Sequence, residues 1–115
     1  MVIVTARLVF ASQEARDAAV EASIPIQAAT RREEPGCQMY CFAPDPAVPT
    51  EIQVYELWDD PESLEKHFAH ENYFAMVRAL RSVDGFLESI NRQWAADDRG
   101  TVYDEDGKAR IAALA

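Results

Sequence analysis

The amino-acid sequence predicts an α+β domain in which helices cover one face of an antiparallel sheet. Three observations support this prediction. Residues 2–10 are rich in β-branched residues and contain no turn former, which is typical of a strand. Residues 51–58 alternate between two faces, as a half-buried strand does. Residues 15–33, and the stretch that begins at Pro61, are amphipathic with helical spacing.

The first helix is predicted over residues 15–33. Ser12 can cap its N-terminus, and alanines at helical spacing give it one apolar face. Glu34-Pro35-Gly36 ends it. A second strand is then expected over residues 37–43, followed by a loop over residues 44–49, because the three prolines of that loop cannot donate to a sheet ladder.

The strand at residues 51–58 places Ile52, Val54, Glu56 and Trp58 on one face. Asp60 is the expected N-cap of the next helix, and Pro61 suits its first position. This helix runs through Phe68 and then continues or restarts near Asn72.

The C-terminal part gives weaker local signals. We expect a short helical turn within residues 86–96 and a last strand at residues 101–103. The Ala-rich end from Lys108 is expected to fray or to dock on a partner. The domain prediction is therefore a ferredoxin-fold domain over residues 1–95. Residues 96–115 form a C-terminal extension that carries the candidate last strand and belongs to the same domain or to a dimer contact.

The predicted order β-α-β-β-α-(α)-β corresponds to the ferredoxin-like split β-α-β arrangement. Strand alternation gives the sheet a second, partly apolar face that the helices of this chain cannot cover. Self-association would cover it, so we expect a homodimer, since a two-fold dimer is the commonest solution.

Composition excludes several classes of protein. The chain has 115 residues, enough for one domain, and a formal net charge of -9, which argues against nucleic acid or an anionic membrane as partner. No apolar run reaches the length of a membrane helix, and the N-terminus lacks the basic region of a signal peptide. Two cysteines make no disulfide framework, so a reduced, cytoplasmic protein is expected.

Nucleotide-binding, zinc-ribbon and hydrolase motifs are missing from the sequence. His67, His70 and Glu71 have the spacing of a metal-binding helix face. Their alternative role is an exposed helix face, and the sequence places no third ligand beside the two histidines. No metal and no cofactor are therefore predicted.

His67 is a candidate general base, because the pKa of histidine lies near working pH and an apolar pocket can tune it. A half-buried histidine bonded to a backbone carbonyl fits the sequence as well. Trp58 is more simply a core residue. Glu56, on an apolar strand face, pairs either with Arg7 or Arg78, or lines a cavity.

Several short motifs together resemble the antibiotic biosynthesis monooxygenase (ABM) family. They are Glu34-Pro35-Gly36-Cys37-x-x-Tyr40, then Val54-Tyr55-Glu56-x-Trp58-x-Asp60-x-x-x-Leu64-x-x-His67, then Tyr73-Phe74. The resemblance spans roughly residues 2–80. It implies a dimeric α/β barrel, in which two ferredoxin-like protomers pack sheet against sheet and each holds a pocket between sheet and helices. Known members include cofactor-independent oxygenases of quinols and anthrones, haem-degrading enzymes and a phosphorylated-sugar isomerase.

The branches of this family differ in their functional residues. The haem-degrading branch has Asn, Trp and His at places similar to Ala6, His67 and Val77 here, so haem degradation is disfavoured. The anthrone-oxygenase branch matches at Trp58 and Arg78 but not at its Asn and Tyr positions, which are Val54 and Leu64 here. The small bacterial quinol-monooxygenase-like members, which share the L-x-x-H helix, are the most similar.

The resemblance implies a monooxygenase that oxidises a small electron-rich aromatic with O2 and needs no cofactor. His67 would be the general base and Trp58 or Arg78 the donor that stabilises an oxyanion. The implied substrate-binding residues are Tyr40, Glu56, Leu64, Phe68, Tyr73, Phe74 and Val77. Two alternatives use the same pocket: an isomerase of a small dicarbonyl or phosphorylated metabolite, and a non-catalytic dimeric ligand-binding or stress module.

Overall fold

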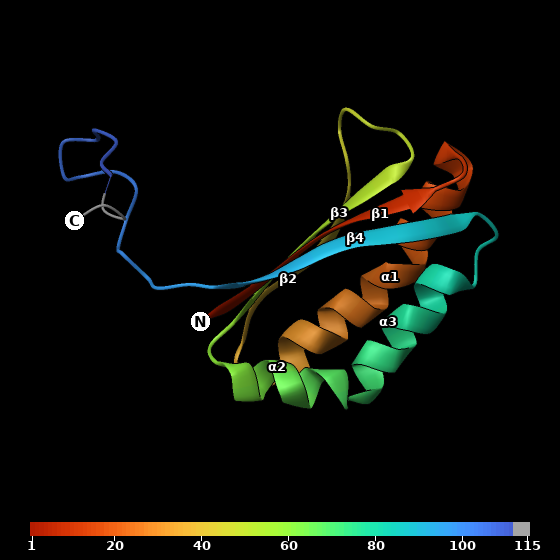
Figure 1. The fold of residues 1–115 in the computed structure, drawn as a ribbon, viewed down its shortest axis with the longest axis horizontal. Helices are drawn as coiled ribbons and strands as arrows, with labels where there is room; N and C mark the ends of the chain where they lie inside the picture. Colours follow the sequence, from red (N-terminus) through yellow and green to blue (C-terminus); the bar gives the residue numbers. More distant parts are fainter. Residues whose placement is uncertain (112–115) are drawn as a thin grey trace.

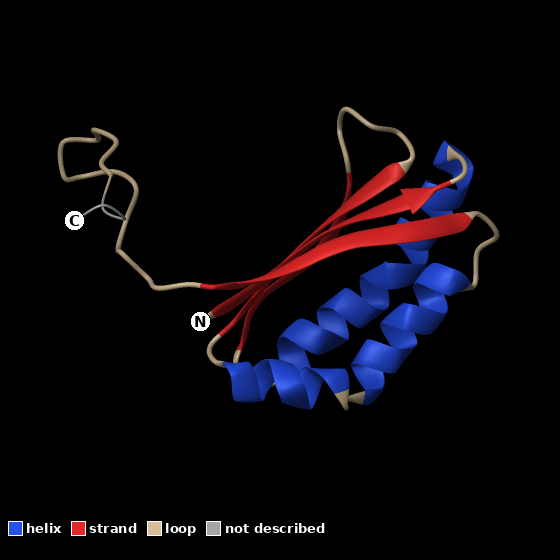
Figure 2. Ribbon diagram, viewed as in Figure 1, coloured by secondary structure: helices blue, strands red, loops and turns tan. Residues whose placement is uncertain are grey.

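The computed structural model describes residues 1–111, which form a four-stranded antiparallel sheet with three helices on one face (Figures 1 and 2). The strands lie in the order β2-β3-β1-β4. Their bounds are Val2–Phe10 (β1), Cys37–Pro44 (β2), Glu51–Trp58 (β3) and Phe86–Ala95 (β4). The helices are Gln13–Glu33 (α1), Pro61–Phe68 (α2) and Glu71–Arg81 (α3). The predicted α+β, ferredoxin-like fold is confirmed.

Side-chain caps determine where the helices begin. Ser12 accepts a hydrogen bond from the backbone N of Ala15 (3.1 Å), and Asp60 accepts one from that of Ser63 (2.8 Å). After α2 the chain restarts rather than continues, because Nδ1 of His70 caps α3 by accepting from the backbone N of Asn72 (2.9 Å). His67 and His70 therefore lie on different elements, which corrects the prediction that they share one helix.

Strand alternation produces the core. Ile52, Val54, Glu56 and Trp58 on β3 are all buried on the helix side of the sheet, as the sequence pattern predicts. The core cluster joins this face to α1, α2 and α3 through Ala19, Leu64, Met76 and Leu80, among others. Figure 1 shows all three helices on that side of the sheet. No helix in the described part of the chain is long and apolar enough to cross a membrane.

The turn between α1 and β2 needs glycine. Gly36 has a φ of 84°, in the left-handed region that side chains disfavour, and a Cβ at this position would overlap the side chain of Ser63. The Glu34–Gly36 turn therefore lies directly on the first turn of α2, and this close approach brings Glu34 to the same end of the sheet as His67.

Two predictions for the C-terminal part are wrong. Residues 86–95 form β4, which pairs with β1 from Val2↔Ala95 to Phe10↔Phe86, and not a helical turn. Pairing with β1 stabilises their strand conformation, and the intrinsic propensity of the residues does not include this contribution. Tyr103 makes only an isolated bridge with Ala109, so residues 101–103 do not join the sheet. The expected behaviour of the Ala-rich end lies partly outside the described residues, at 112–115.

The face of the sheet away from the helices is partly apolar and is uncovered in the single chain. Met39, Tyr55, Ile90 and Trp94 expose 48%, 36%, 43% and 52% of their surface there. The strand register places Ile90 and Trp94 on this face. They pair with Arg7 and Ile3, whose side chains point to the face opposite to that of the buried Leu8. The second, partly apolar face predicted from strand alternation is thus present.

Candidate functional site

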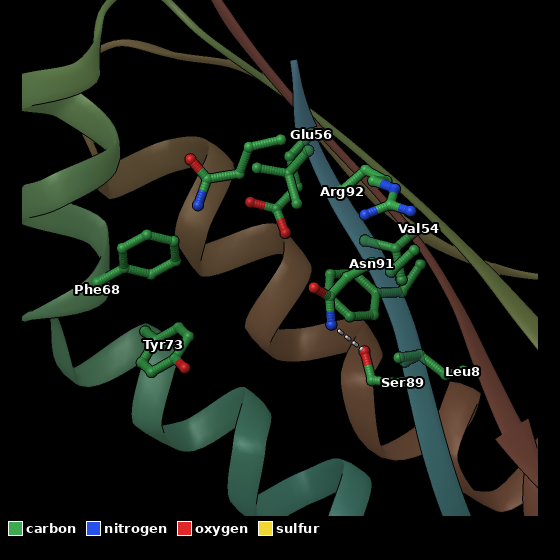
Figure 3. A pocket seen from close by; sticks show the side chains of 12 residues that line it. Leu8, Val54, Glu56, Phe68, Tyr73, Ser89, Asn91 and Arg92 are labelled. Carbon is green, nitrogen blue, oxygen red and sulfur yellow. Dashed lines mark hydrogen bonds between the residues drawn. The ribbon is translucent and has the colours of Figure 1, made fainter.

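A cavity of about 290 Å³ lies between the sheet and the helices (Figure 3). All four strands contribute to its sheet side, β2 through Phe42, while α2 and α3 contribute Phe68 and Tyr73. Its size is at the lower end of small-molecule pockets. The residues that line it are Val4, Ala6, Leu8, Phe42, Val54, Glu56, Phe68, Tyr73, Ser89, Asn91, Arg92 and Gln93.

The β4 residues that face the helix side of the sheet are polar and uncharged. Ser89, Asn91 and Gln93 pair in register with Leu8, Ala6 and Val4, so they face the helix side of the sheet. Arg92 pairs with Thr5, and alternation directs its side chain to the opposite face, although it contributes to the rim of the cavity. The β4 side of the cavity therefore offers amide and hydroxyl groups without a cation directed inward.

Glu56 is the only carboxylate among the lining residues. It is 7% exposed, and its Oε1 accepts a hydrogen bond from Nε1 of Trp58 (3.0 Å). Burial raises the pKa of Glu56 to about 7, the Trp58 hydrogen bond lowers it in part, and the charge of Glu34 raises it further. Figure 3 shows the Glu56 carboxylate pointing from the sheet toward the space in front of Phe68 and Tyr73.

The two arginines considered as partners of Glu56 bind elsewhere. Nε of Arg7 lies 2.8 Å from Oε1 of Glu51, and Arg78 pairs with Glu71 on the exposed surface of α3. Of the two alternatives that the sequence leaves open for Glu56, the structure supports a carboxylate that lines a cavity.

His67 lies behind this cavity, in the core. It is 1% exposed, and its Nδ1 lies 2.8 Å from Oε1 of Glu34. Its ring packs on Trp58, with ring centroids 4.7 Å apart and an angle of 34° between the planes. Burial lowers the pKa of His67, and the hydrogen bond and charge of Glu34 oppose that effect. The partner of His67 is thus a carboxylate, not the backbone carbonyl that the alternative interpretation expected.

Glu34 joins the end of α1 to the start of α3. Its Oε2 accepts a hydrogen bond from Nδ2 of Asn72 (3.2 Å) and lies 3.9 Å from Nδ1 of His70. The side chain is 4% exposed, so two histidines and an amide surround a buried carboxylate. Among the described residues, no group of three or more His, Cys, Asp or Glu side chains is arranged to hold a metal ion.

The structure separates the residues predicted from the sequence into three groups. Glu56, Phe68 and Tyr73 line the cavity, and Val77 lines an adjoining hollow that also contains Tyr73 and Ser89. Other predicted residues are buried behind the cavity wall: Tyr40, Trp58, Leu64 and His67. Arg78 and Phe74 lie on the surface, with 64% of the Arg78 side chain and 45% of Phe74 exposed.

Sequence reasoning missed the β4 residues and Glu34. Residues 89–94 alternate between polar Ser89, Asn91 and Gln93 and a second face with Ile90 and Trp94. This alternation is the signal that would have predicted a strand with one polar face. For Glu34 there is no comparable signal, because its position in the core depends on the contact between the Gly36 turn and α2.

The chain is thus an α+β, ferredoxin-like domain with a cavity between its sheet and its helices. The family model described as antibiotic biosynthesis monooxygenase matches residues 1–79, and the chain belongs to that family. The search of the curated proteins found no match.

Solved structures share the fold at low sequence identity. A candidate antibiotic biosynthesis monooxygenase from Deinococcus radiodurans is 24% identical, with a TM-score of 0.76, and the match covers 90% of this chain and 100% of that one. Another from Nitrosomonas europaea is 14% identical, with a TM-score of 0.72, over 84% of this chain and 98% of that one. SnoaB, a cofactor-independent oxygenase from Streptomyces nogalater, is 13% identical, with a TM-score of 0.62, over 84% of this chain and 93% of that one.

Proposed function

We propose that this protein is a cofactor-independent monooxygenase that oxidises a small electron-rich aromatic, such as a quinol or an anthrone, with O2. The observation that supports the proposal is the cavity itself, which is mostly apolar, has aromatic walls and contains one carboxylate, in a chain of the monooxygenase family. SnoaB, which shares the fold, is described as cofactor-independent, and this description is consistent with the proposal.

The chemistry needs few protein groups. Removing a proton from a phenol or an anthrone leaves an electron-rich anion, which can pass an electron to O2 without metal or flavin. For an anthrone, one CH2 group and O2 become one carbonyl group and water, so the substrate supplies both electrons that reduce the second oxygen atom. The protein must supply a proton acceptor, an apolar cavity and donors for the developing oxyanion. The side-chain amides of Asn91 and Gln93 are such donors.

Charge favours a neutral substrate. The cavity contains Glu56 and no inward-directed cation, and the chain carries a net charge of -9. A phosphorylated metabolite would meet repulsion from Glu56 there, and the one cation of the lining, Arg92, lies at the rim on a residue that alternates to the other face of the sheet. This observation makes the isomerase alternative less favourable for phosphorylated compounds.

We further propose a homodimer in which the uncovered faces of two sheets pack together. Met39, Tyr55, Ile90 and Trp94 give that face the apolar surface that a stable interface requires. Residues 96–111 extend from β4 beyond the sheet (Figure 1), where Arg110 bonds the carbonyls of Thr101 (2.8 Å) and Arg99 (3.0 Å). Since Val102 and Tyr103 each expose 62% of their surface, we propose that this extension packs on the partner subunit.

Oxygen uptake tests the proposed activity. Purified, metal-stripped protein is given a panel of naphthoquinols and anthrones, and uptake is corrected for autoxidation. We expect protein-dependent uptake that survives chelation. Turnover without O2 would favour the isomerase instead, and tight aromatic binding without turnover would favour the ligand-binding module.

A further inference from the structure

We propose that Glu56 is the catalytic base, which takes the proton of the bound aromatic, and that His67 is a positioning residue that does not touch the substrate. This inference rests on the proposed function and names the group that starts the reaction. It depends on which side chain reaches the cavity: Glu56 lines it, whereas His67 is buried against Trp58 and Tyr73 and is not among the lining residues.

The two oxygens of Glu56 have different environments. Oε1 accepts the hydrogen bond from Nε1 of Trp58, which fixes the orientation of the carboxylate. Within residues 1–111, no protein donor is hydrogen-bonded to Oε2 of Glu56. This oxygen is not among the buried atoms that lack a partner, so it is open to the cavity, and the hydroxyl of a bound phenol can donate a hydrogen bond to it.

Glu56 is also a base of suitable strength. Because burial raises its pKa to about 7, a large fraction is ionised at neutral pH, and the carboxylate is far more basic than an exposed one. In the proposed step the O–H bond of the phenol, or the activated C–H bond of an anthrone, breaks. The proton moves to Oε2 of Glu56 and the electron pair stays on the substrate. The protonated Glu56 can then donate a hydrogen bond to the anion while O2 accepts an electron from the ring.

Few charged or titratable groups surround Glu56. Glu34 acts on it through its charge, and the charge of Glu56 acts in turn on the Tyr40 hydroxyl group and the Cys37 thiol of β2. His67 on α2 packs on the Trp58 ring, and Tyr73 on α3 lines the same cavity as Glu56. On β4 the nearest cation, Arg92, alternates to the other face. No cation among the described residues neutralises Glu56, which agrees with its raised pKa.

His67 is already engaged by other groups. Its Nδ1 bonds Glu34, and its ring lies among Trp58, Tyr40 and Tyr73, with centroid distances of 4.7, 5.3 and 5.6 Å. This packing holds Trp58, and Trp58 holds Glu56. Substituting His67 is therefore expected to loosen the site without removing the base.

The test compares Glu56→Gln with His67→Gln by oxygen uptake across a pH series. We expect kcat/KM of the wild type to rise with pH through about 7. Glu56→Gln should lose about 100-fold or more, the range of a general base, and should lose the pH dependence. Glu56→Asp should retain part of the activity with a shifted midpoint. His67→Gln should lose less than tenfold and keep the wild-type midpoint. Full activity in Glu56→Gln, or loss of the midpoint only in His67→Gln, would overturn the assignment.

A second readout does not depend on oxygen chemistry. Calorimetry with 2-naphthol, an unreactive phenol, measures proton release on binding in buffers of different ionisation enthalpy. Near pH 6.5 the wild type and His67→Gln should release protons, because the bound hydroxyl favours ionised Glu56, and Glu56→Gln should not. Proton-linked binding without oxygen uptake would support Glu56 and contradict the oxygenase. Uptake unaffected by Glu56→Gln would contradict Glu56 alone, and neither binding nor uptake would overturn both.

Discussion

Nδ1 of His67 lies 2.8 Å from Oε1 of Glu34, and both side chains are at most 4% exposed. His67 belongs to α2, and Glu34 is the residue that follows α1. Asn72 of α3 donates a hydrogen bond to the second oxygen of the same carboxylate. One buried carboxylate thus ties three helices together beside the cavity. A hydrogen bond to a buried charged group contributes about 1.5–3 kcal/mol, so this contact is among the stronger polar contacts of the fold.

We predict that Glu34→Ala lowers the free energy of unfolding by about 2–4 kcal/mol, because it leaves the ring N–H of His67 without its acceptor. The neighbouring Glu33→Ala is the matched control. Its carboxylate is 44% exposed and pairs only with Arg32, so its loss should cost less than about 0.5 kcal/mol. Urea denaturation at pH 7.5 measures both variants. Equal midpoints would show that the Glu34–His67 contact contributes nothing to stability.

The same pair should respond to acid. Burial lowers the pKa of His67 below its ordinary 6.5, so the unfolded chain binds a proton at this residue before the folded protein does. Stability from the neutral His67 is therefore present above pH 6.5 and is lost as pH falls below it. The stability difference between wild type and His67→Gln should shrink over that range, and a difference that grows on acidification would contradict the lowered pKa.

Glu56 should show the opposite pH dependence. Its pKa is raised from 4.5 to about 7, so the folded protein binds a proton that the unfolded chain has already released. Stability thus falls as pH rises from about 4.5 to 7, by as much as about 3 kcal/mol. Glu56→Gln lacks this ionisation. We predict that it gains stability relative to wild type over this range, which denaturation at pH 4.5 and at pH 8 measures. A constant difference would mean that Glu56 titrates normally.

If Glu56 is the base, this result would also mean that the active site is maintained at a cost in stability. A carboxylate kept in an apolar cavity destabilises the ionised folded protein, and an amide of the same shape does not. Glu56→Gln should then be more stable and less active at neutral pH. This combination distinguishes a functional carboxylate from one that supports the fold.

The sequence predicted the parts of the fold that depend on local signals. Caps at Ser12 and Asp60, and the alternation in residues 51–58, specify their elements through neighbours in the chain. Residues 86–95 form a strand that pairs with β1, and the short alternation within residues 89–94 is its only local signal in the described part of the chain. The site followed the same rule. Strand alternation is enough to place Glu56 on a buried strand face. The burial of His67 depends instead on its contact with Glu34, which is 33 residues away in the chain.

The position of β4 leads to a prediction about the oxyanion donor. Asn91 faces the cavity, and Arg78, one of the two donors predicted from the sequence, pairs with Glu71 on the surface. We expect Asn91→Ala to reduce kcat/KM by about 100-fold, as the loss of an oxyanion donor does, and Arg78→Ala to change it less than threefold. Oxygen uptake at saturating and limiting substrate separates kcat from KM. The reverse order of effects would show that Arg78 reaches the site.

The uncovered face of the sheet can be tested with two isoleucines that are similarly exposed. Ile90 lies on that face with 43% of its surface exposed, and Ile24 lies on α1 with 50% exposed. In the proposed homodimer, Ile90→Lys buries an unpaired charge between two sheets, whereas Ile24→Lys leaves its charge in water. We predict that light scattering after gel filtration finds a dimer for the wild type and for Ile24→Lys, and a monomer for Ile90→Lys at micromolar concentration. Far-ultraviolet circular dichroism checks that both variants remain folded. A wild-type monomer, or a dimer that Ile90→Lys leaves intact, would contradict packing through this face.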